Sequence, residues 1–199
     1  IVDDQKRRWR LPLGHQEFGP LLDAAALRIC REVATERDLF NCHGTFYELP
    51  AENADGFAKI RPIASHNFRI HDYASFRGLL VMTGIDPQAI NANHHIVASR
   101  DGQAAVWVGA IDDLWRMGKP LGRGGPWKNS VIRAGQPSDP YLFGFYDHRT
   151  LTLQHTAPEP VRFVIQLEPL GHGPWFKWKE VTVAPGEPFC YEFPRGLNA

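Results

Sequence analysis

Residues 95–111 read HIVASRDGQAAVWVGAI, two stretches of β-forming residues on either side of Ser99-Arg100-Asp101-Gly102-Gln103. An Asp-Gly pair supplies the positive φ that a tight hairpin turn requires, and here it joins two runs rich in valine and isoleucine. The stretch therefore predicts an antiparallel hairpin with strands at 95–99 and 104–111. The rest of the fold is interpreted outward from this hairpin.

The same pattern of β-formers between turn residues continues along the chain. The sequence has 18 glycines and 16 prolines, and they separate short runs of valine, isoleucine, phenylalanine, tyrosine and threonine. No long helices occur between these runs to carry parallel crossovers, so the sheets are expected to be antiparallel. The further predicted strands are 9–13, 29–35, 41–49, 58–64, 68–74, 79–84, 141–146, 151–155, 161–168, 175–183 and 189–193.

Three other segments differ from the strand pattern. Apolar residues at helical spacing predict a short helix near 20–28, and a second helical turn is expected at 111–117. Residues 118–140 are expected to form a long loop rich in glycine and proline, of a length that in compact domains is usually functional or flexible.

Charge and composition exclude several classes of function. The chain has 22 basic and 22 acidic side chains, so it lacks the net positive charge of most proteins that bind nucleic acid. The basic cluster at 6–10 is either an anion-binding or localisation patch or a solvated strand edge, and we favour the strand edge. No apolar run approaches the ~20 residues of a membrane span, and the three cysteines lack the spacing of a zinc site. We therefore expect no membrane span and assign no metal ligands, and whether the protein uses a metal or a cofactor stays open.

Three longer runs resemble a known group of proteins. RICREVATERDLFNCHGTFYELP (28–50), FAKIRPIASHNFRIHDYASFRGLLVMTG (57–84) and AAVWVGAIDDLW (104–115) are similar to successive blades of β-propellers from bacterial extracellular proteins of polysaccharide breakdown. Ser99, Asp101 and Trp107 resemble the Asp-box turn of sialidase-type propellers, although the glycine and tryptophan spacings each differ by one residue. His43 and His66 are similar to the paired histidines of propellers of the ulvan-lyase kind.

The resemblance implies an all-β, antiparallel, propeller-like fold, either a partial propeller or a fragment of a larger chain, with a β-sandwich as the alternative. A chain that begins with Ile1 is either a processed product or a piece of a longer one. A blade takes about 40–50 residues, so 199 residues hold about four. We expect a propeller-like domain over 1–149 and a β-rich segment over 150–199. The resemblance also implies a secreted protein, extracellular or periplasmic.

The candidate catalytic residues are His43, His66 and Tyr47. Imidazole titrates near neutral pH, and a tyrosine can return a proton to a leaving oxygen. If 41–49 is one strand, alternation places His43 and Tyr47 on the same face. The alternative is that these side chains only form hydrogen bonds at a strand edge.

The candidate substrate-binding residues are Arg61, Arg77, His71 and Trp127. The planar guanidinium matches the carboxylate of an acidic sugar, and an indole can stack on a sugar ring. The predicted function is a carbohydrate-active protein that acts on an acidic extracellular polysaccharide as a lyase or glycoside hydrolase. The alternative is a non-catalytic β module that binds glycans or protein, so whether the chain is an enzyme stays open. In the first case the partner is a polysaccharide or oligosaccharide.

Overall fold

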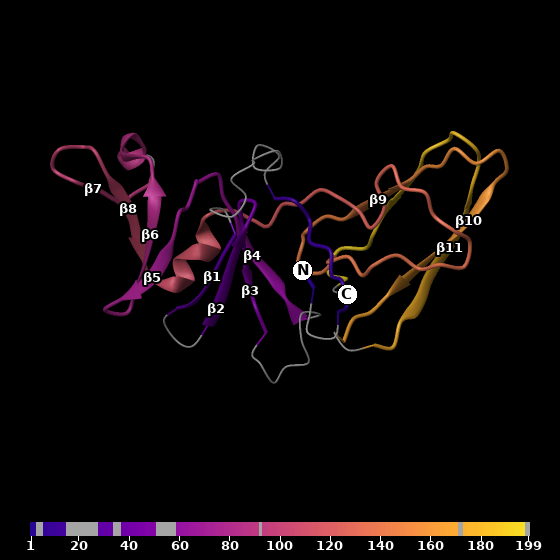
Figure 1. The fold of residues 1–199 in the computed structure, drawn as a ribbon, viewed down its shortest axis with the longest axis horizontal. Helices are drawn as coiled ribbons and strands as arrows, with labels where there is room; N and C mark the ends of the chain where they lie inside the picture. Colours follow the sequence, from indigo (N-terminus) through magenta and orange to yellow (C-terminus); the bar gives the residue numbers. More distant parts are fainter. Residues whose placement is uncertain are drawn as a thin grey trace. The chain divides into compact units, whose positions relative to one another are not determined.

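The computed structural model describes residues 1–2, 6–14, 28–33, 37–50, 59–91, 93–170 and 173–197. These residues form antiparallel β-sheets with very little helix, which confirms the predicted all-β class (Figure 1). No closed barrel or closed ring of blades is found among them. The chain divides into two units, residues 1–141 and 142–199, so the structural division comes earlier than the predicted boundary at 149.

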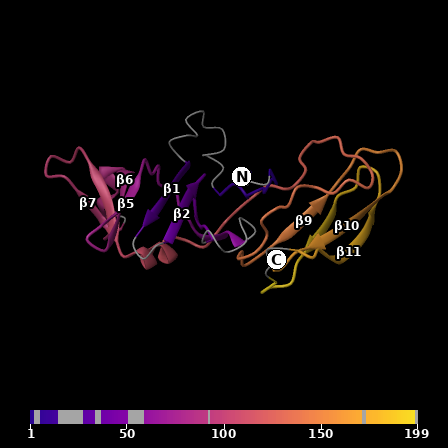
Figure 2. The ribbon, with the colours of Figure 1, turned by 60° about the horizontal axis from the view of Figure 1, so that its bottom comes forward.

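The first unit begins with a sheet of four strands in sequence order. Its strands are β1 (Arg28–Val33), β2 (Arg37–Cys42), β3 (Thr45–Glu48) and β4 (Arg61–Ser65). Each strand pairs antiparallel with the next, and Figure 2 shows β1 and β2 side by side. Leu39 is buried in the alternating pattern of β2, whereas β3 and β4 bury consecutive side chains, Phe46 and Ile63 among them, and so are covered on both faces.

The second sheet has the order β5-β6-β8-β7. Its elements are β5 (Tyr73–Phe76), β6 (Leu79–Ile85), the 3₁₀ helix η3 (Pro87–Asn91), β7 (Ile96–Ala98) and β8 (Ala105–Gly109). A second 3₁₀ helix, η4 (Ile111–Arg116), follows β8 and contacts β4. It confirms the helical turn predicted at 111–117.

The hairpin predicted at 95–111 is confirmed as β7 and β8. The Ser99 hydroxyl donates to the Asp101 carboxylate, which also accepts the Gln103 N–H at 3.1 Å. The Ala104 N–H donates to the Ser99 oxygen at 3.1 Å. The hydrogen bond from Ser99 lowers the pKa of Asp101. Trp107, on β8, is fully buried.

The two four-stranded sheets share one hydrophobic core. Tyr73 joins them directly, because its hydroxyl on β5 lies 2.7 Å from the carbonyl oxygens of Ile29 on β1 and Leu39 on β2. An ion pair between Arg31 and Asp72 also connects the sheets at the surface. The main core residues are Ile29, Val33, Leu39, Phe46, Ile63, Tyr73, Leu80, Met82, Trp107 and Leu114.

The second unit consists of two antiparallel strand pairs. β10 (Val161–Leu167) pairs with β11 (Phe176–Val183), and β12 (Phe189–Glu192) pairs with β9 (Thr150–Leu153). Arg149 is almost buried beside β9, and its guanidinium donates to the carbonyl oxygens of Pro194 and Leu197. This fork holds the end of the unit against β9.

The prediction of one strand over 41–49 is wrong. β2 ends at Cys42 and β3 begins at Thr45, and these two residues face each other across a two-residue turn. His43 and Gly44 have φ angles of 50° and 75°, which is the pattern of a type I′ hairpin turn. Alternation therefore does not run through the turn, and the argument that placed His43 and Tyr47 on one face does not hold.

Other predicted elements differ in extent. Residues 9–13 and 141–146 form no continuous strand, because only Arg10, Leu13 and Tyr141 make single β-bridges there. Over 68–74 the only strand residues are Tyr73 and the one after it, at the start of β5. The helix predicted near 20–28 lies outside the described residues except for residue 28, which begins β1.

Candidate functional site

The two predicted catalytic histidines come together at one end of the first sheet. His43 lies in the β2–β3 turn, and the carbonyl oxygen of the next residue, Gly44, accepts the backbone N–H of His66 at 2.8 Å. His66 directly follows β4. The side chains are largely enclosed, because His43 is 7% exposed and His66 is 5% exposed.

Both ring nitrogens of His66 have partners within the protein. The Nδ1 atom accepts the backbone N–H of Phe68 at 3.2 Å, so Nδ1 carries no proton. The Nε2 atom lies 2.9 Å from Oδ1 of Asn41, a buried acceptor, and therefore donates to it. These two bonds define a neutral imidazole protonated at Nε2, packed 5.0 Å from the ring of Phe46.

Tyr47 is fully buried on β3. Its hydroxyl donates to the backbone carbonyl of Pro12 at 3.1 Å. This bond fastens the segment before the first sheet to the middle of β3. Its assignment as a proton donor stays a prediction.

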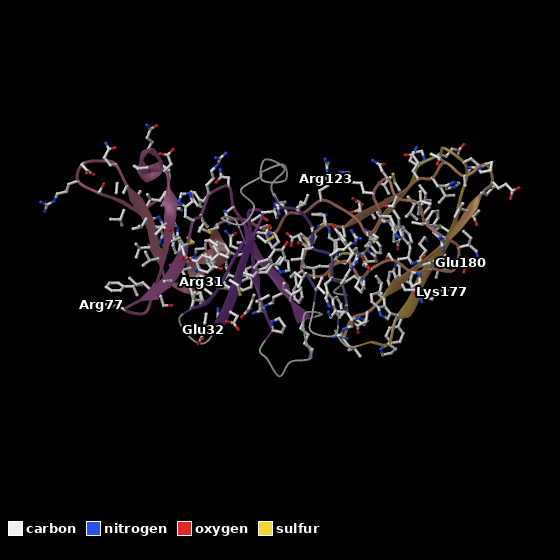
Figure 3. The ribbon with its side chains drawn as sticks, in the orientation of Figure 1. Arg31, Glu32, Arg77, Arg123, Lys177 and Glu180 are labelled. Atoms are coloured by element: carbon white, nitrogen blue, oxygen red, sulfur yellow. The ribbon has the colours of Figure 1, made fainter. Side chains whose placement is uncertain are left out.

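The other predicted binding residues lie apart from the histidines. Arg61 begins β4, at the opposite end of that strand from His66, where it pairs with Glu48 and lies 5.6 Å over the ring of Trp115. Arg77 is exposed in the β5–β6 turn of the second sheet, and Figure 3 labels it there. His71 is exposed just before β5, with its backbone N–H bonded to Thr83. The structure does not gather these three residues around His43.

Trp127, in contrast, lines a pocket of about 230 Å³ in the first unit. The indole is 37% exposed. The pocket is built from the 118–140 loop and one residue of the segment before the first sheet, Arg10. The polar and charged residues around it are Arg10, Ser130, Arg133, Gln136, Ser138 and Asp139.

An ion pair spans this pocket. The Arg10 guanidinium lies 2.9 Å from the Asp139 carboxylate, and the two side chains remain 48% and 30% exposed. The Arg10 backbone N–H also donates to the Pro140 carbonyl at 2.8 Å. The lining of the pocket therefore combines an aromatic side chain with a pair of opposite charges. This arrangement suits a ligand with one apolar face and several hydroxyl groups.

The first sheet holds the pocket segments in place through buried polar side chains. The Ser65 oxygen on β4 accepts the Leu121 N–H at 2.9 Å and lies 3.1 Å from the hydroxyl of Thr45. Leu13 and Arg123 exchange two backbone hydrogen bonds of 3.0 and 2.9 Å. Together with the bond from Tyr47 to Pro12, these contacts connect β3 and β4 to both segments that line the pocket.

Sequence reasoning identified Trp127 but missed its neighbours Arg10, Arg133, Gln136 and Asp139. Two signals pointed toward them. The 118–140 loop has a length that is usually functional or flexible, and Arg10 belongs to the basic cluster that was interpreted as a strand edge. Neither signal placed the two segments side by side.

Three further observations concern the whole described part of the chain. Its residues include no group of three or more His, Cys, Asp or Glu side chains arranged to hold a metal ion. No helix within the same residues has the length and apolar character to cross a membrane. Comparison of the chain with protein families, with curated proteins and with solved structures finds no match.

Proposed function

We propose that this chain is a glycan-binding module of a carbohydrate-active protein, and that the Trp127 pocket holds one sugar unit of a polysaccharide or oligosaccharide. The observation that carries the proposal is that the Trp127 indole and the Arg10–Asp139 ion pair line one pocket. The C–H face of a sugar ring stacks on an indole, and its hydroxyls bond to charged groups at the ring edge.

The size of the pocket fits this role. Pockets for drug-sized ligands occupy about 300–1,000 Å³. A pocket of about 230 Å³ suits a single ring whose neighbours in the glycan stay outside it. A polysaccharide ligand of this kind also agrees with an extracellular or periplasmic location.

Binding without chemistry is the version that the geometry favours. A general base needs a lone pair directed at its substrate, but Nδ1 of His66 accepts a backbone N–H and Nε2 donates to Asn41. The hydroxyl of Tyr47 is fully buried and bonded to a carbonyl. A lyase or hydrolase that uses His43, His66 and Tyr47 would have to open this packing during turnover.

The test of binding is a titration of oligosaccharides followed by tryptophan fluorescence and calorimetry. Trp127→Ala should weaken binding by at least about tenfold, equivalent to ~1.4 kcal/mol. Trp175→Ala is the matched control, because Trp175 is exposed in the second unit and should leave affinity unchanged. Equal losses in the two variants, or no loss in Trp127→Ala, would contradict the pocket assignment.

The catalytic version has its own assay. An acidic polysaccharide incubated with a lyase gives unsaturated products that absorb ultraviolet light. Such products from the wild-type protein, absent with a folded His66→Gln variant, would reverse our preference for binding alone. Product formation at the same rate in both proteins would remove His66 from the reaction.

We further propose that the first unit is propeller-like, with β1–β4 as one blade. Four antiparallel strands in sequence order are the topology of a blade, and two such sheets packed through one core resemble neighbouring blades. The hydrogen bond between Ser99 and Asp101 in the β7–β8 turn and the burial of Trp107 on β8 also support the similarity to an Asp-box turn. The order β5-β6-β8-β7 departs from a blade, and a β-sandwich would pack similarly. An experimental structure of the protein with no common axis between the two sheets would exclude the propeller.

A further inference from the structure

The two segments that form the pocket differ in charge from the rest of the protein. Residues 6–14 and 118–140 together contain one acidic side chain, Asp139. The rest of the sequence has 14 basic and 21 acidic side chains, so the overall neutrality conceals a strong separation of charge. The basic side chains of the two segments number eight, and they are Lys6, Arg7, Arg8, Arg10, Lys119, Arg123, Lys128 and Arg133.

Backbone hydrogen bonds join these segments into one surface, which we call the basic strip (residues 6–14 and 118–140). Leu13 pairs with Arg123 through two hydrogen bonds, and Arg10 bonds to the Pro140 carbonyl. Arg10 and Arg133 line the same pocket. Arg123, labelled in Figure 3, and Lys128 are exposed on the same loop.

From this charge separation, we propose that the basic strip binds a polyanionic polysaccharide, one that carries carboxylate or sulfate groups on successive sugars. This inference rests on the proposed glycan-binding function and names the class of glycan. Guanidinium groups pair with carboxylate and sulfate in two-point contacts, and a row of exposed cations concentrates a polyanion along the surface. The acidic group is therefore recognised by the strip rather than by Arg61 or Arg77.

The strip fits a polysaccharide better than a nucleic acid. Proteins that bind single strands stack successive bases on several aromatic side chains along a groove. Among the described residues of the strip there are two tryptophans, and one of them, Trp9, already has the Arg7 guanidinium 5.6 Å from its ring. Trp127 thus offers one stacking position, next to the cations.

The experiment compares charged glycans with a neutral one, and dextran sulfate and dextran form a pair with the same backbone. Dextran sulfate, polygalacturonate and unmodified dextran are titrated into the protein at 50 and 300 mM NaCl. We expect dextran sulfate and polygalacturonate to bind at least about tenfold more tightly than dextran at low salt, and their affinity to fall with added salt as counterions are released.

Two triple variants distinguish binding by the basic strip from a nonspecific effect of the protein's net charge. Arg123→Gln, Lys128→Gln and Arg133→Gln together should weaken dextran sulfate binding by about tenfold or more at 50 mM NaCl and flatten its salt dependence. The control triple, Arg69→Gln, Arg100→Gln and Arg195→Gln, removes three exposed cations from outside the strip and should change affinity less than threefold. Circular dichroism checks that both remain folded.

The possible failures can be told apart. Equal affinity for dextran and dextran sulfate, or equal weakening by both triples, would overturn the inference and leave the glycan pocket standing. Single-stranded DNA competing as well as polygalacturonate at equal charge would overturn the assignment to a polysaccharide. If the strip triple weakens binding of dextran sulfate but Trp127→Ala does not, the inference about the basic strip stands and the pocket proposal is refuted.

Discussion

Replacing Tyr73 with phenylalanine removes a hydroxyl that bonds the two sheets of the first unit together. Tyr73 is 2% exposed, and its oxygen lies 2.7 Å from the carbonyls of Ile29 and Leu39. Phenylalanine keeps the packing of the ring but leaves both buried carbonyls without this donor. Leaving buried polar groups unsatisfied costs about 1–3 kcal/mol, which is the expected fall in the free energy of unfolding at neutral pH.

The same substitution changes the response to alkaline pH. Burial raises the pKa of the Tyr73 hydroxyl above that of a free tyrosine, about 10. Above pH 10 the unfolded chain loses this proton while the folded protein keeps it, so the free energy of unfolding falls as pH rises. The slope from this group is about 1.4 kcal/mol per pH unit, and Tyr73→Phe lacks it. The stability difference between the wild type and the variant should therefore narrow above pH 10.

Urea titrations followed by circular dichroism at pH 7 and at pH 10.5–11 measure both effects. Tyr191→Phe is the matched control, since that hydroxyl is in the second unit and accepts only a 3.3 Å bond from the partly exposed Trp178 indole. Its cost should stay within about 0.5 kcal/mol. Equal costs for the two variants at pH 7, or a gap that widens above pH 10 for Tyr73→Phe, would refute the reasoning.

Three further substitutions test the backbone and the second unit. Gly84→Ala should lower the free energy of unfolding by more than about 3 kcal/mol or prevent folding, because φ is 82° and a Cβ would lie 2.3 Å from the carbonyl oxygen of Arg69. Gly78→Ala is the control, because its φ of 80° is similar but the space around it is open; urea titration should show a loss of only about 1–2 kcal/mol. Arg77→Asn should raise the melting temperature slightly, because asparagine tolerates the positive φ of this turn better than arginine, and it should leave glycan affinity unchanged. Arg149→Lys should lower the free energy of unfolding by about 2–3 kcal/mol, because the two bonds come from two separate guanidinium nitrogens and lysine has a single nitrogen without that planar fork. Hydrogen exchange should locate the loss in residues 142–199, and protection lost mainly in 1–141 would contradict it.

The fold could be predicted where turn chemistry and alternation agreed. Asp101-Gly102 located the β7–β8 hairpin, and alternating apolar residues located β10. The prediction failed at the turn between β2 and β3, where His43 and Gly44 have positive φ angles. Asn-Gly and Asp-Gly pairs are the usual sequence signals of such a turn, and His-Gly is a weaker one. An apolar run continued on both sides of His43, so the turn was interpreted as the interior of a strand.

The pocket was harder to predict than the sheets. Its residues come from segments more than 100 positions apart that have no regular periodicity, and backbone bonds such as Leu13 to Arg123 leave no pattern in the sequence. Trp127 was predicted only as an indole that can stack on a sugar ring, and its position in the pocket follows from the placement of the Gly/Pro loop. Net charge carries no signal of the pocket, because a chain that is neutral in total can still concentrate its cations in two segments.

Buried polar residues of β3 and β4 form hydrogen bonds with the irregular segments that lie next to these strands. A long segment without regular structure leaves backbone N–H and C=O groups that need partners when they approach a sheet. The Tyr47 hydroxyl donates to the Pro12 carbonyl, and the Ser65 oxygen accepts the Leu121 N–H. Each side chain therefore satisfies a backbone group of a loop segment that forms no ladder with the strand. Serine and tyrosine inside strands next to a long Gly/Pro loop are thus expected for a scaffold that positions that loop, just as they are for a catalytic pocket. In this chain the hydrogen bonds of Tyr47 and Ser65 lead to the two segments that carry the pocket residues, whereas those of His66 lead to Asn41 and Phe68. Positioning of these segments therefore accounts for Tyr47, a residue that first suggested catalysis, while His66 is accounted for by its bonds next to the first sheet.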